Sequence, residues 1–163
     1  MKIGVLADTH SKPVPKEVLA AFKDVDFIIH AGDLCAQEDL NALKKIKEVK
    51  AVFGNMDDMN LRGKLPEKEI IRVEGVAIGL CHGEGPAKRV LDFVRANFAK
   101  DKVQVVIFGH SHQPCEELID GILYFNPGSP NDTITAPYCS YGILEITAGK
   151  IKHKIVKVGD PNG

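Results

Sequence analysis

The sequence has few of the features that mark secreted, membrane-spanning or nucleic-acid-binding proteins. Only four cysteines occur among its 163 residues, they are widely scattered, and no two form a C-x-x-C pair. This pattern predicts reduced thiols in a cytoplasmic protein rather than a disulfide framework. No apolar run approaches the roughly 20 residues that span a bilayer. A formal net charge of −1 provides no field that would attract nucleic acid or an acidic membrane. We therefore expect neither stable nucleic-acid binding nor membrane attachment.

The length and the two ends of the chain bound the domain organisation. Met1 leads directly into an apolar run, without the basic start or cleavage site of a signal peptide. A chain of 163 residues is long enough to bury one sizeable core. We expect a single domain over residues 1–158 and a disordered tail at 159–163.

The first third of the chain alternates short apolar runs with amphipathic segments. Such strand–helix–strand alternation favours parallel pairing with right-handed crossovers. The predicted strands are 2–7, 27–30 and 50–53, the predicted helices are about 15–24 and 37–48, and 56–66 is predicted to be a loop.

The remainder of the chain is mainly antiparallel in character. Short runs with a β-branched bias flank turn signals at Glu74-Gly75, Asp120-Gly121 and Ala148-Gly149. A helix is predicted from Pro86 to about Phe98. The predicted strands are 69–73, 76–80, 103–108, 118–119, 122–125, 141–146 and 151–158.

Polar residues follow five of the buried strands at the points where these strands end. Because open α/β sheets place their sites beyond the carboxyl ends of strands, we expect these side chains to lie together. We expect Asp8 and His10 to converge because residues two apart in an extended chain point to the same side. The candidate ligands are Asp8, His10, Asp33, Asn55, His82, His110 and His112.

Each of these residues also has an ordinary structural interpretation. Asp33 could cap a helix, Asn55 could form a turn, and His82 could be a hydrogen-bonded turn residue. Outside the set, His30 is expected to support the site or to pack, and His153 is expected at the surface. The occurrence of all seven at consecutive strand ends favours a metal site. Mixed oxygen and imidazole ligands suit manganese, iron, zinc, cobalt or nickel better than calcium.

The sequence blocks that carry these residues resemble the calcineurin-like metallophosphoesterases. The blocks are Asp8-x-His10, Gly32-Asp33, Gly54-Asn55, His82 and Gly109-His110-x-His112, in the order of that family. Gly54-Asn55-Met56-Asp57 and Asn126-Pro127-Gly128-Ser129 are similar to its small bacterial and archaeal phosphodiesterase branch. For the fold, the resemblance implies the α/β class, a four-layer α-β-β-α sandwich of two mixed sheets flanked by helices.

For the site, the resemblance implies two divalent transition-metal ions. One ion would be held by Asp8, His10, Asp33 and His112, and the second by Asn55, His82 and His110, with Asp33 bridging the two. Asp33, Asn55 and His82 would position a metal-bridging hydroxide and the phosphate. Mn²⁺ or Ni²⁺ is favoured, and Zn²⁺, Fe²⁺ or Co²⁺ also suits the ligands. With the hydroxide, the cluster would keep about one net positive charge, which favours binding of a phosphate oxygen.

One position departs from the family pattern. Many members carry a histidine directly after the Gly-Asn pair, taken to protonate the leaving oxygen, and here that residue is Met56. Substrates with poor leaving groups are therefore expected to react slowly.

The expected function is a dinuclear-metal phosphodiesterase that uses the bridging hydroxide as nucleophile on a small phosphoester. The alternatives are a phosphomonoesterase acting on a small metabolite and a non-catalytic binding protein similar to the retromer scaffold subunit. Lys12 and Arg62, in loops beside the ligand blocks, could contact substrate phosphate or simply be solvated charges. A homo-oligomer, in the simplest case a dimer, is left open.

Overall fold

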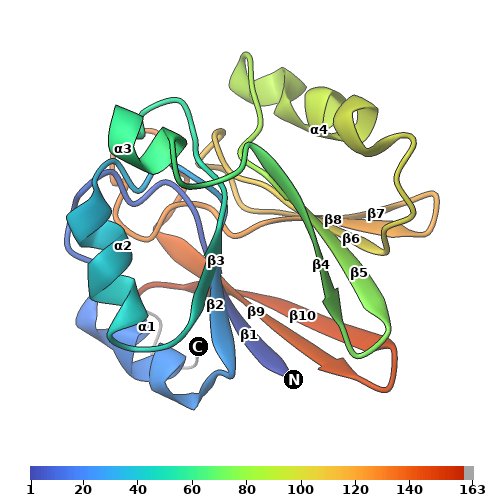
Figure 1. The fold of residues 1–163 in the computed structure, drawn as a ribbon, viewed down its shortest axis with the longest axis horizontal. Coiled ribbons are helices and arrows are strands. Elements are labelled where there is room, and N and C mark those ends of the chain that lie inside the picture. Colours follow the sequence, from blue (N-terminus) through green and yellow to red (C-terminus); the bar gives the residue numbers. More distant parts are fainter. Residues whose placement is uncertain (160–163) are drawn as a thin grey trace.

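Residues 1–159 are described by a computed structural model, and these residues form two five-stranded sheets (Figure 1). In the first sheet, β1, β2 and β3 are parallel, whereas β9 runs antiparallel to both β1 and β10. The strand order is β10-β9-β1-β2-β3. The strands are β1 (Lys2–Leu6), β2 (Phe27–His30), β3 (Val49–Ala51), β9 (Ser140–Thr147) and β10 (Lys150–Lys157).

The second sheet is also mixed. Its inner strands β5, β6 and β8 are parallel, and each edge strand pairs antiparallel with its neighbour. The strand order is β4-β5-β6-β8-β7. The strands are β4 (Lys68–Val73), β5 (Val76–Cys81), β6 (Val105–Ile107), β7 (Cys115–Ile119) and β8 (Ile122–Asn126).

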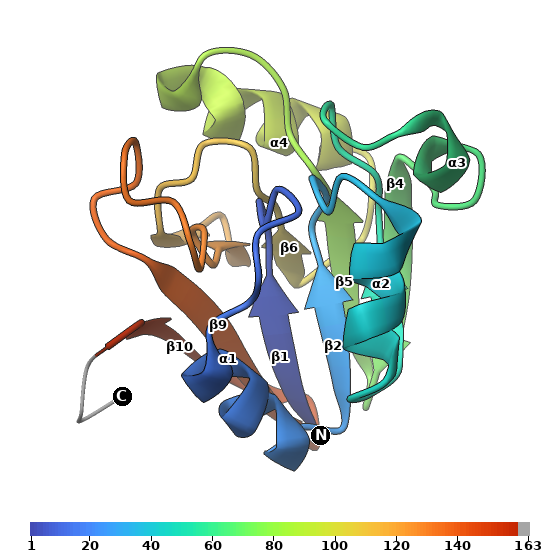
Figure 2. The same ribbon diagram turned by 90° about the vertical axis from the view of Figure 1, so that its left-hand side faces the viewer.

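The helices lie on the outer faces of the two sheets (Figures 1 and 2). α1 (Lys16–Ala21) and α2 (Gln37–Lys44) pack on the first sheet, and α4 (Val90–Phe98) packs on the second. A separate apolar cluster joins the inner faces, with Val5 and Ile29 on one side and Ile78 and Ile107 on the other. The predicted four-layer α/β sandwich of two mixed sheets is therefore confirmed.

Several element boundaries differ from the sequence prediction. The predicted loop 56–66 contains a short helix, α3 (Met59–Arg62), in which Leu61 is buried and the Asp58 carboxylate accepts the Leu61 amide at 2.8 Å. Four residues are too few to show helical periodicity in the sequence. α2 ends at Lys44 rather than near 48, because the chain must turn to enter β3. Residues 22–24 and 87–89 form 3₁₀ turns beside α1 and α4.

Two further expectations concern the ends of the chain and membranes. Apart from Gly159, the predicted tail lies outside the described residues. Within residues 1–159, every helix is too short or too polar to cross a bilayer.

Close packing between α4 and the second sheet generates a stability prediction. A Cβ atom at Gly79 would lie 2.5 Å from a ring carbon of the buried Phe98. We expect Gly79→Ala to lower the free energy of unfolding by about 1–3 kcal/mol, measured by chemical denaturation. In a Phe98→Leu background the same change should cost less, because the two residues compete for one space. Gly63→Ala, at a helix end with a φ of −75°, is the matched control and should change stability by no more than about 0.5 kcal/mol.

Candidate metal centre

The seven candidate ligands all lie at one end of the molecule. Strands β1, β2, β5 and β6 point their carboxyl ends toward this end (Figure 2). The loops after β1, β2 and β3 come from the first sheet, and those after β5 and β6 come from the second. The site therefore spans the junction of the two sheets, and its side chains fall into two groups.

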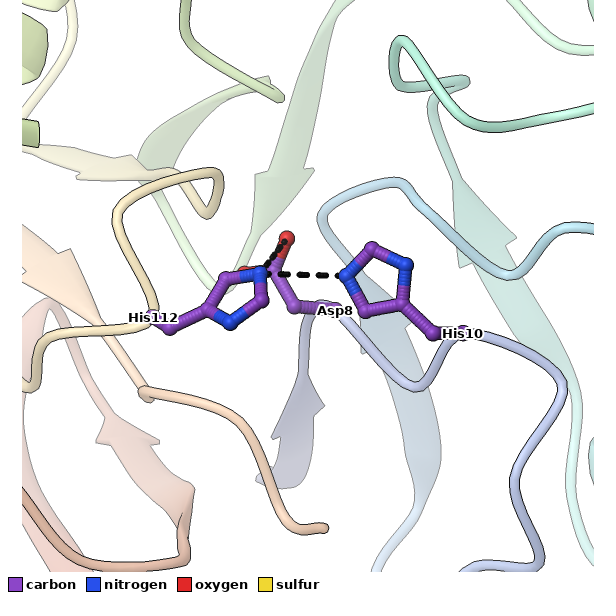
Figure 3. A group of neighbouring side chains, drawn as sticks. All are labelled: Asp8, His10 and His112. Atoms are coloured by element: carbon purple, nitrogen blue, oxygen red, sulfur yellow. Dashed lines mark hydrogen bonds and ion pairs between the residues drawn. The ribbon is translucent and has the colours of Figure 1, made fainter. Parts of the chain in front are cut away.

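The first group contains Asp8, His10 and His112 (Figure 3). The Nε2 atoms of His10 and His112 are 3.0 Å apart, and Nε2 of His112 lies 3.6 Å from Oδ1 of Asp8. Oδ2 of Asp33 lies 3.8 Å from Nε2 of His10. The donor atoms of Asp8, His10 and His112 are within 4.8 Å of one another, close enough to share one ion.

The second group contains Asn55, His82 and His110. Oδ1 of Asn55 is 3.1 Å from Nε2 of His82 and 2.9 Å from Nδ1 of His110. Oδ2 of Asp33 is 3.3 Å from Nε2 of His82. The same carboxylate oxygen of Asp33 therefore faces both groups.

The backbone at these residues is bent rather than extended. Five of the seven candidates have a positive φ, between 50° and 68°. Residues other than glycine rarely adopt this left-handed backbone conformation, and those that do are often found at functional sites. The expectation that Asp8 and His10 converge through strand alternation was wrong, because turns after β1 bring them together. The five residues are Asp8, His10, Asp33, His110 and His112.

Glycines precede several ligands because other groups pass very close to them. A Cβ atom at Gly32 would lie 2.7 Å from Nδ1 of His82, and one at Gly54 would overlap the carboxylate of Asp33. A larger residue at either position would push these ligands apart.

In three of the histidines, the ring nitrogen that points away from the centre forms a hydrogen bond to an oxygen, which fixes the orientation of the ring. Nδ1 of His82 donates to the carbonyl of Ala31 at 2.8 Å, and Nε2 of His110 donates to the carbonyl of Gly85 at 2.8 Å. Nδ1 of His112 lies 2.5 Å from Oδ2 of Asp132. Each bond leaves the lone pair of the other ring nitrogen facing the centre, as in histidines that bind metals.

The resulting donor set fits a metal ion. Imidazole nitrogens, carboxylate oxygens and an amide oxygen converge at 2.9–3.8 Å from one another, around the space that a cation would occupy. Asp8 and Asp33 are 0% and 2% exposed, so water cannot compensate for their charge. Nitrogen and oxygen ligands together suit first-row transition metals.

Burial and the neighbouring charges shift the pKa values of the two carboxyls at the centre. Burial raises the pKa of Asp8 to about 6, although the charges of His82 and His112 act in the opposite direction. Burial is the largest single effect on Asp33 and acts to raise its pKa, but the hydrogen bond with His82, the charges of His82 and His10 and the Met56 amide together hold the pKa below its usual value. The two carboxyls are therefore unequal before any metal binds.

Asp57 supports the site in a way that the sequence did not reveal. Its carboxylate is buried and accepts the backbone amides of Asp33 at 3.0 Å, Cys35 at 2.6 Å and Gly54 at 2.6 Å. It thereby ties the loop after β2 to the loop after β3. The helix-capping interpretation of Asp33 was wrong, because α2 begins four residues later, at Gln37.

Asp132 is a second supporting residue that sequence reasoning missed. Besides His112, its carboxylate accepts the hydroxyl of Thr135 and the backbone amide of Ile134 at 2.8 Å. Burial is the largest single effect and acts to raise its pKa, but the hydrogen bonds from His112, Thr135 and the backbone amide of Ile134 together hold the pKa well below its usual value. Asp132 lies 20 residues beyond its partner, in a loop with no recognisable pattern.

The other residues singled out from the sequence lie around the centre or away from it. His30 is fully buried and hydrogen-bonds through Nε2 to the Thr9 hydroxyl at 3.1 Å, so it packs and supports the turn after β1. His153 is exposed, as predicted, and pairs with Glu116 at 2.9 Å. Arg62 and Lys12 line two cavities on opposite sides of the centre.

Comparison with known proteins identifies the family of this arrangement. The model of the calcineurin-like phosphoesterase superfamily domain matches residues 1–149. The chain is 34% identical to a probable metallophosphoesterase of Methanothermobacter thermautotrophicus, over 99% of this chain and 95% of that protein. It is 37% identical to a probable metallophosphoesterase of Methanocaldococcus jannaschii, over 97% of this chain and 82% of that protein. A phosphodiesterase of the same organism is 28% identical, over 78% of this chain and 83% of that protein.

Solved structures share the fold. Vps29 from Entamoeba histolytica complexed with zinc superposes with a TM-score of 0.74 at 25% identity, covering 96% of this chain and 99% of that one. An archaeal phosphodiesterase superposes with a TM-score of 0.75 at 23% identity, covering 96% of this chain and all of that one.

The burial of Asp8 generates a prediction about pH and stability. Its folded-state pKa is raised from 3.8 to about 6, so the folded protein favours the protonated carboxyl. The contribution of Asp8 to folding stability is therefore complete at low pH and is lost as the pH rises through 6. At pH 7, Asp8→Asn should therefore stabilise the metal-free protein, by at most about 3 kcal/mol. Thermal unfolding of both metal-free proteins should show this gain narrowing from pH 7 to pH 5.

Asp92→Asn, at an exposed position on α4, is the control and should show no such pH dependence. A metal-free Asp8→Asn protein no more stable than the wild type at pH 7 would contradict the assignment. In excess metal the wild type should become more stable than Asp8→Asn, because the wild type binds the metal more tightly.

Proposed function

The chain belongs to the calcineurin-like phosphoesterase superfamily, and we propose that it is a phosphodiesterase that works with two divalent transition-metal ions. The observation that carries this proposal is the position of Asp33 Oδ2, which lies 3.8 Å from His10 on one side and 3.3 Å from His82 on the other. A single oxygen that faces two groups of ligands is suited to bridge two ions.

The seven ligands divide between the ions as follows. Asp8, His10 and His112 would hold the first ion together with Asp33, and Asn55, His82 and His110 would hold the second together with the same Asp33. Both groups would offer imidazole nitrogens, and Asp8 and Asp33 would supply the two negative charges. This mixture favours Mn²⁺ or Ni²⁺ and also accommodates Zn²⁺, Fe²⁺ or Co²⁺.

The metal ions, when bound, would supply Lewis-acid charge that activates a water and neutralises the phosphoryl oxygens. The chain itself orients the ligands. Asp57 fixes the relative position of Asp33 and the Asn55 loop, and Asp132 holds the ring of His112. Met56 has an exposed side chain that can donate no proton. We therefore propose that the enzyme prefers substrates whose leaving oxygen departs without protonation.

Two cavities flank the centre and favour a diester over a monoester. One, of about 240 Å³, includes Asn55 and His82 in its wall, and the other, of about 290 Å³, includes Asp8, His10 and His112. A small phosphodiester has two organic arms, one for each cavity, whereas a monoester would leave one cavity unused. The M. jannaschii relative named as a phosphodiesterase is consistent with this preference.

The main alternative is a binding protein without catalytic activity. The resemblance to Vps29 supports this alternative in fold, and the zinc complex of Vps29 indicates that bound metal alone does not distinguish the two functions. The complete set of seven donors and the two flanking cavities favour the enzyme.

The direct test is a metal-by-substrate screen. Protein stripped of metal and reloaded with Mn²⁺ or Ni²⁺ should hydrolyse bis(p-nitrophenyl) phosphate faster than p-nitrophenyl phosphate. Rates are measured by release of p-nitrophenolate, and metal content is measured by elemental analysis of the same samples. Inactivity toward both esters, in protein that holds two ions per chain, would favour the binding protein. A faster rate with the monoester would favour the phosphomonoesterase.

The bridging role generates a second prediction. Asp33→Asn keeps an oxygen that can accept the Met56 amide, now bonded to Oδ1 at 2.7 Å, but it removes the charge that both groups share. We expect this variant to retain less than one metal ion per chain and to lose nearly all activity. The Asp92→Asn control should retain two ions. Two ions in Asp33→Asn would show that the carboxylate does not bridge.

A further inference from the structure

The cavity beside Asn55 and His82 has a lining that none of the proposed metal chemistry requires. It lies between the loop after β3, α3 and α4, and its walls include Phe53, Arg62 and Phe93. Because it adjoins two of the candidate ligands, an organic arm of a phosphoester held at the centre can enter it directly.

Two aromatic rings face this cavity. Phe93 projects from α4 with 37% of its surface exposed, and Phe53 follows β3. The guanidinium of Arg62 lies 5.7 Å from the centroid of the Phe53 ring. A large apolar ring left partly in water beside a catalytic centre provides a stacking surface for a planar group.

The polar groups of the cavity favour donors over acceptors on the ligand. Glu67 and Glu84 contribute two carboxylates, and Asn97 contributes an amide. The single cation, Arg62, already donates to the backbone carbonyls of Asn55 at 2.5 Å and Asp57 at 2.9 Å. With two carboxylates and one guanidinium, the formal charge of the lining is negative, so a second phosphate on the ligand would be repelled.

We propose that this cavity binds a nucleoside arm of the substrate, with the base against Phe93 and its N–H donors toward the carboxylates. The proposal rests on the phosphodiesterase function and names its substrate class: diesters of a nucleoside with no further phosphate. The cavity of about 240 Å³ lies just below the usual range of small-molecule sites, so it holds a single arm rather than a chain of nucleotides.

The cavity on the other side of the centre has a different character. Its lining includes Lys12, Asn131 and Thr135 but no Phe, Tyr or Trp. The aromatic rings in this lining are the imidazoles of His10 and His112, which the proposed function assigns to a metal ion, so the protein distinguishes the two arms of the diester.

The kinetic test compares two esters with the same leaving group: adenosine 5′-(p-nitrophenyl phosphate) and methyl p-nitrophenyl phosphate. The metal-loaded wild type should favour the adenosine ester in kcat/KM by at least about tenfold, the size of one base–aromatic contact. Phe93→Ala should reduce that ratio by about tenfold. Tyr138→Ala is the matched control, since Tyr138 is 38% exposed but packs near Lys157, and the ratio should not change.

A charge test uses the adenosine ester with an additional 3′-phosphate. The wild type should hydrolyse it less efficiently than the parent ester, and Glu67→Gln should narrow this difference because it removes one repelling charge. An additional phosphate that improves kcat/KM would overturn the assignment of the cavity.

The last readout is independent of activity. Adenosine titrated into the metal-free protein should shift the backbone amide resonances of Glu67, Phe93 and Asn97 and leave those of Lys12 and Thr135 unchanged. Shifts confined to Lys12 and Thr135, or no shifts at all, would overturn the inference. If the loaded wild type hydrolyses both esters equally, the inference fails while the phosphodiesterase function stands. If it hydrolyses neither, that function fails, and the titration alone decides whether the cavity binds a nucleoside.

Discussion

The convergence of two buried carboxylates and four imidazole rings at the junction of the two sheets is the constraint on which this site depends. Imidazole nitrogens of His10 and His112 lie 3.0 Å apart, and the carboxylates of Asp8 and Asp33 are buried beside them. Such a cluster is unfavourable in a protein without a counter-charge. The surrounding structure must therefore hold these groups together against their repulsion until cations bind.

The fold holds them with backbone geometry and with buried hydrogen bonds. Most of the candidate ligands sit in left-handed turns that their own residue types do not favour, and these turns are fixed from outside. Asp57 accepts three backbone amides from the loops after β2 and β3. Asp132 and two backbone carbonyls orient the histidine rings. The supporting residues thus hold the ligands in position, while the ligand atoms themselves remain available to bind metal.

The two sheets contribute differently to function. The first sheet supplies Asp8, Asp33 and Asn55 from its parallel strands, and the second supplies the histidines that follow β5 and β6. The apolar cluster between the sheets fixes the position of one set of residues relative to the other. α3 and α4 then add the walls of a cavity next to the centre. The candidate ligands and the walls of this cavity therefore come largely from separate elements of the same fold.

The sequence by itself determined the family, the α/β class and the seven candidate ligands, because Gly-Asp, Gly-Asn and Gly-His-x-His blocks follow short apolar runs that suit buried strands. It also showed that Met56 stands where many members of the family carry a histidine. The tertiary structure showed the contacts within each group of ligands, since pairs such as His10 and His112 join residues 102 positions apart. It showed that turns, and not strand alternation, bring Asp8 and His10 together. Asp57 and Asp132 acquired their roles only through contacts between distant loops, for which local sequence carries no physical signal.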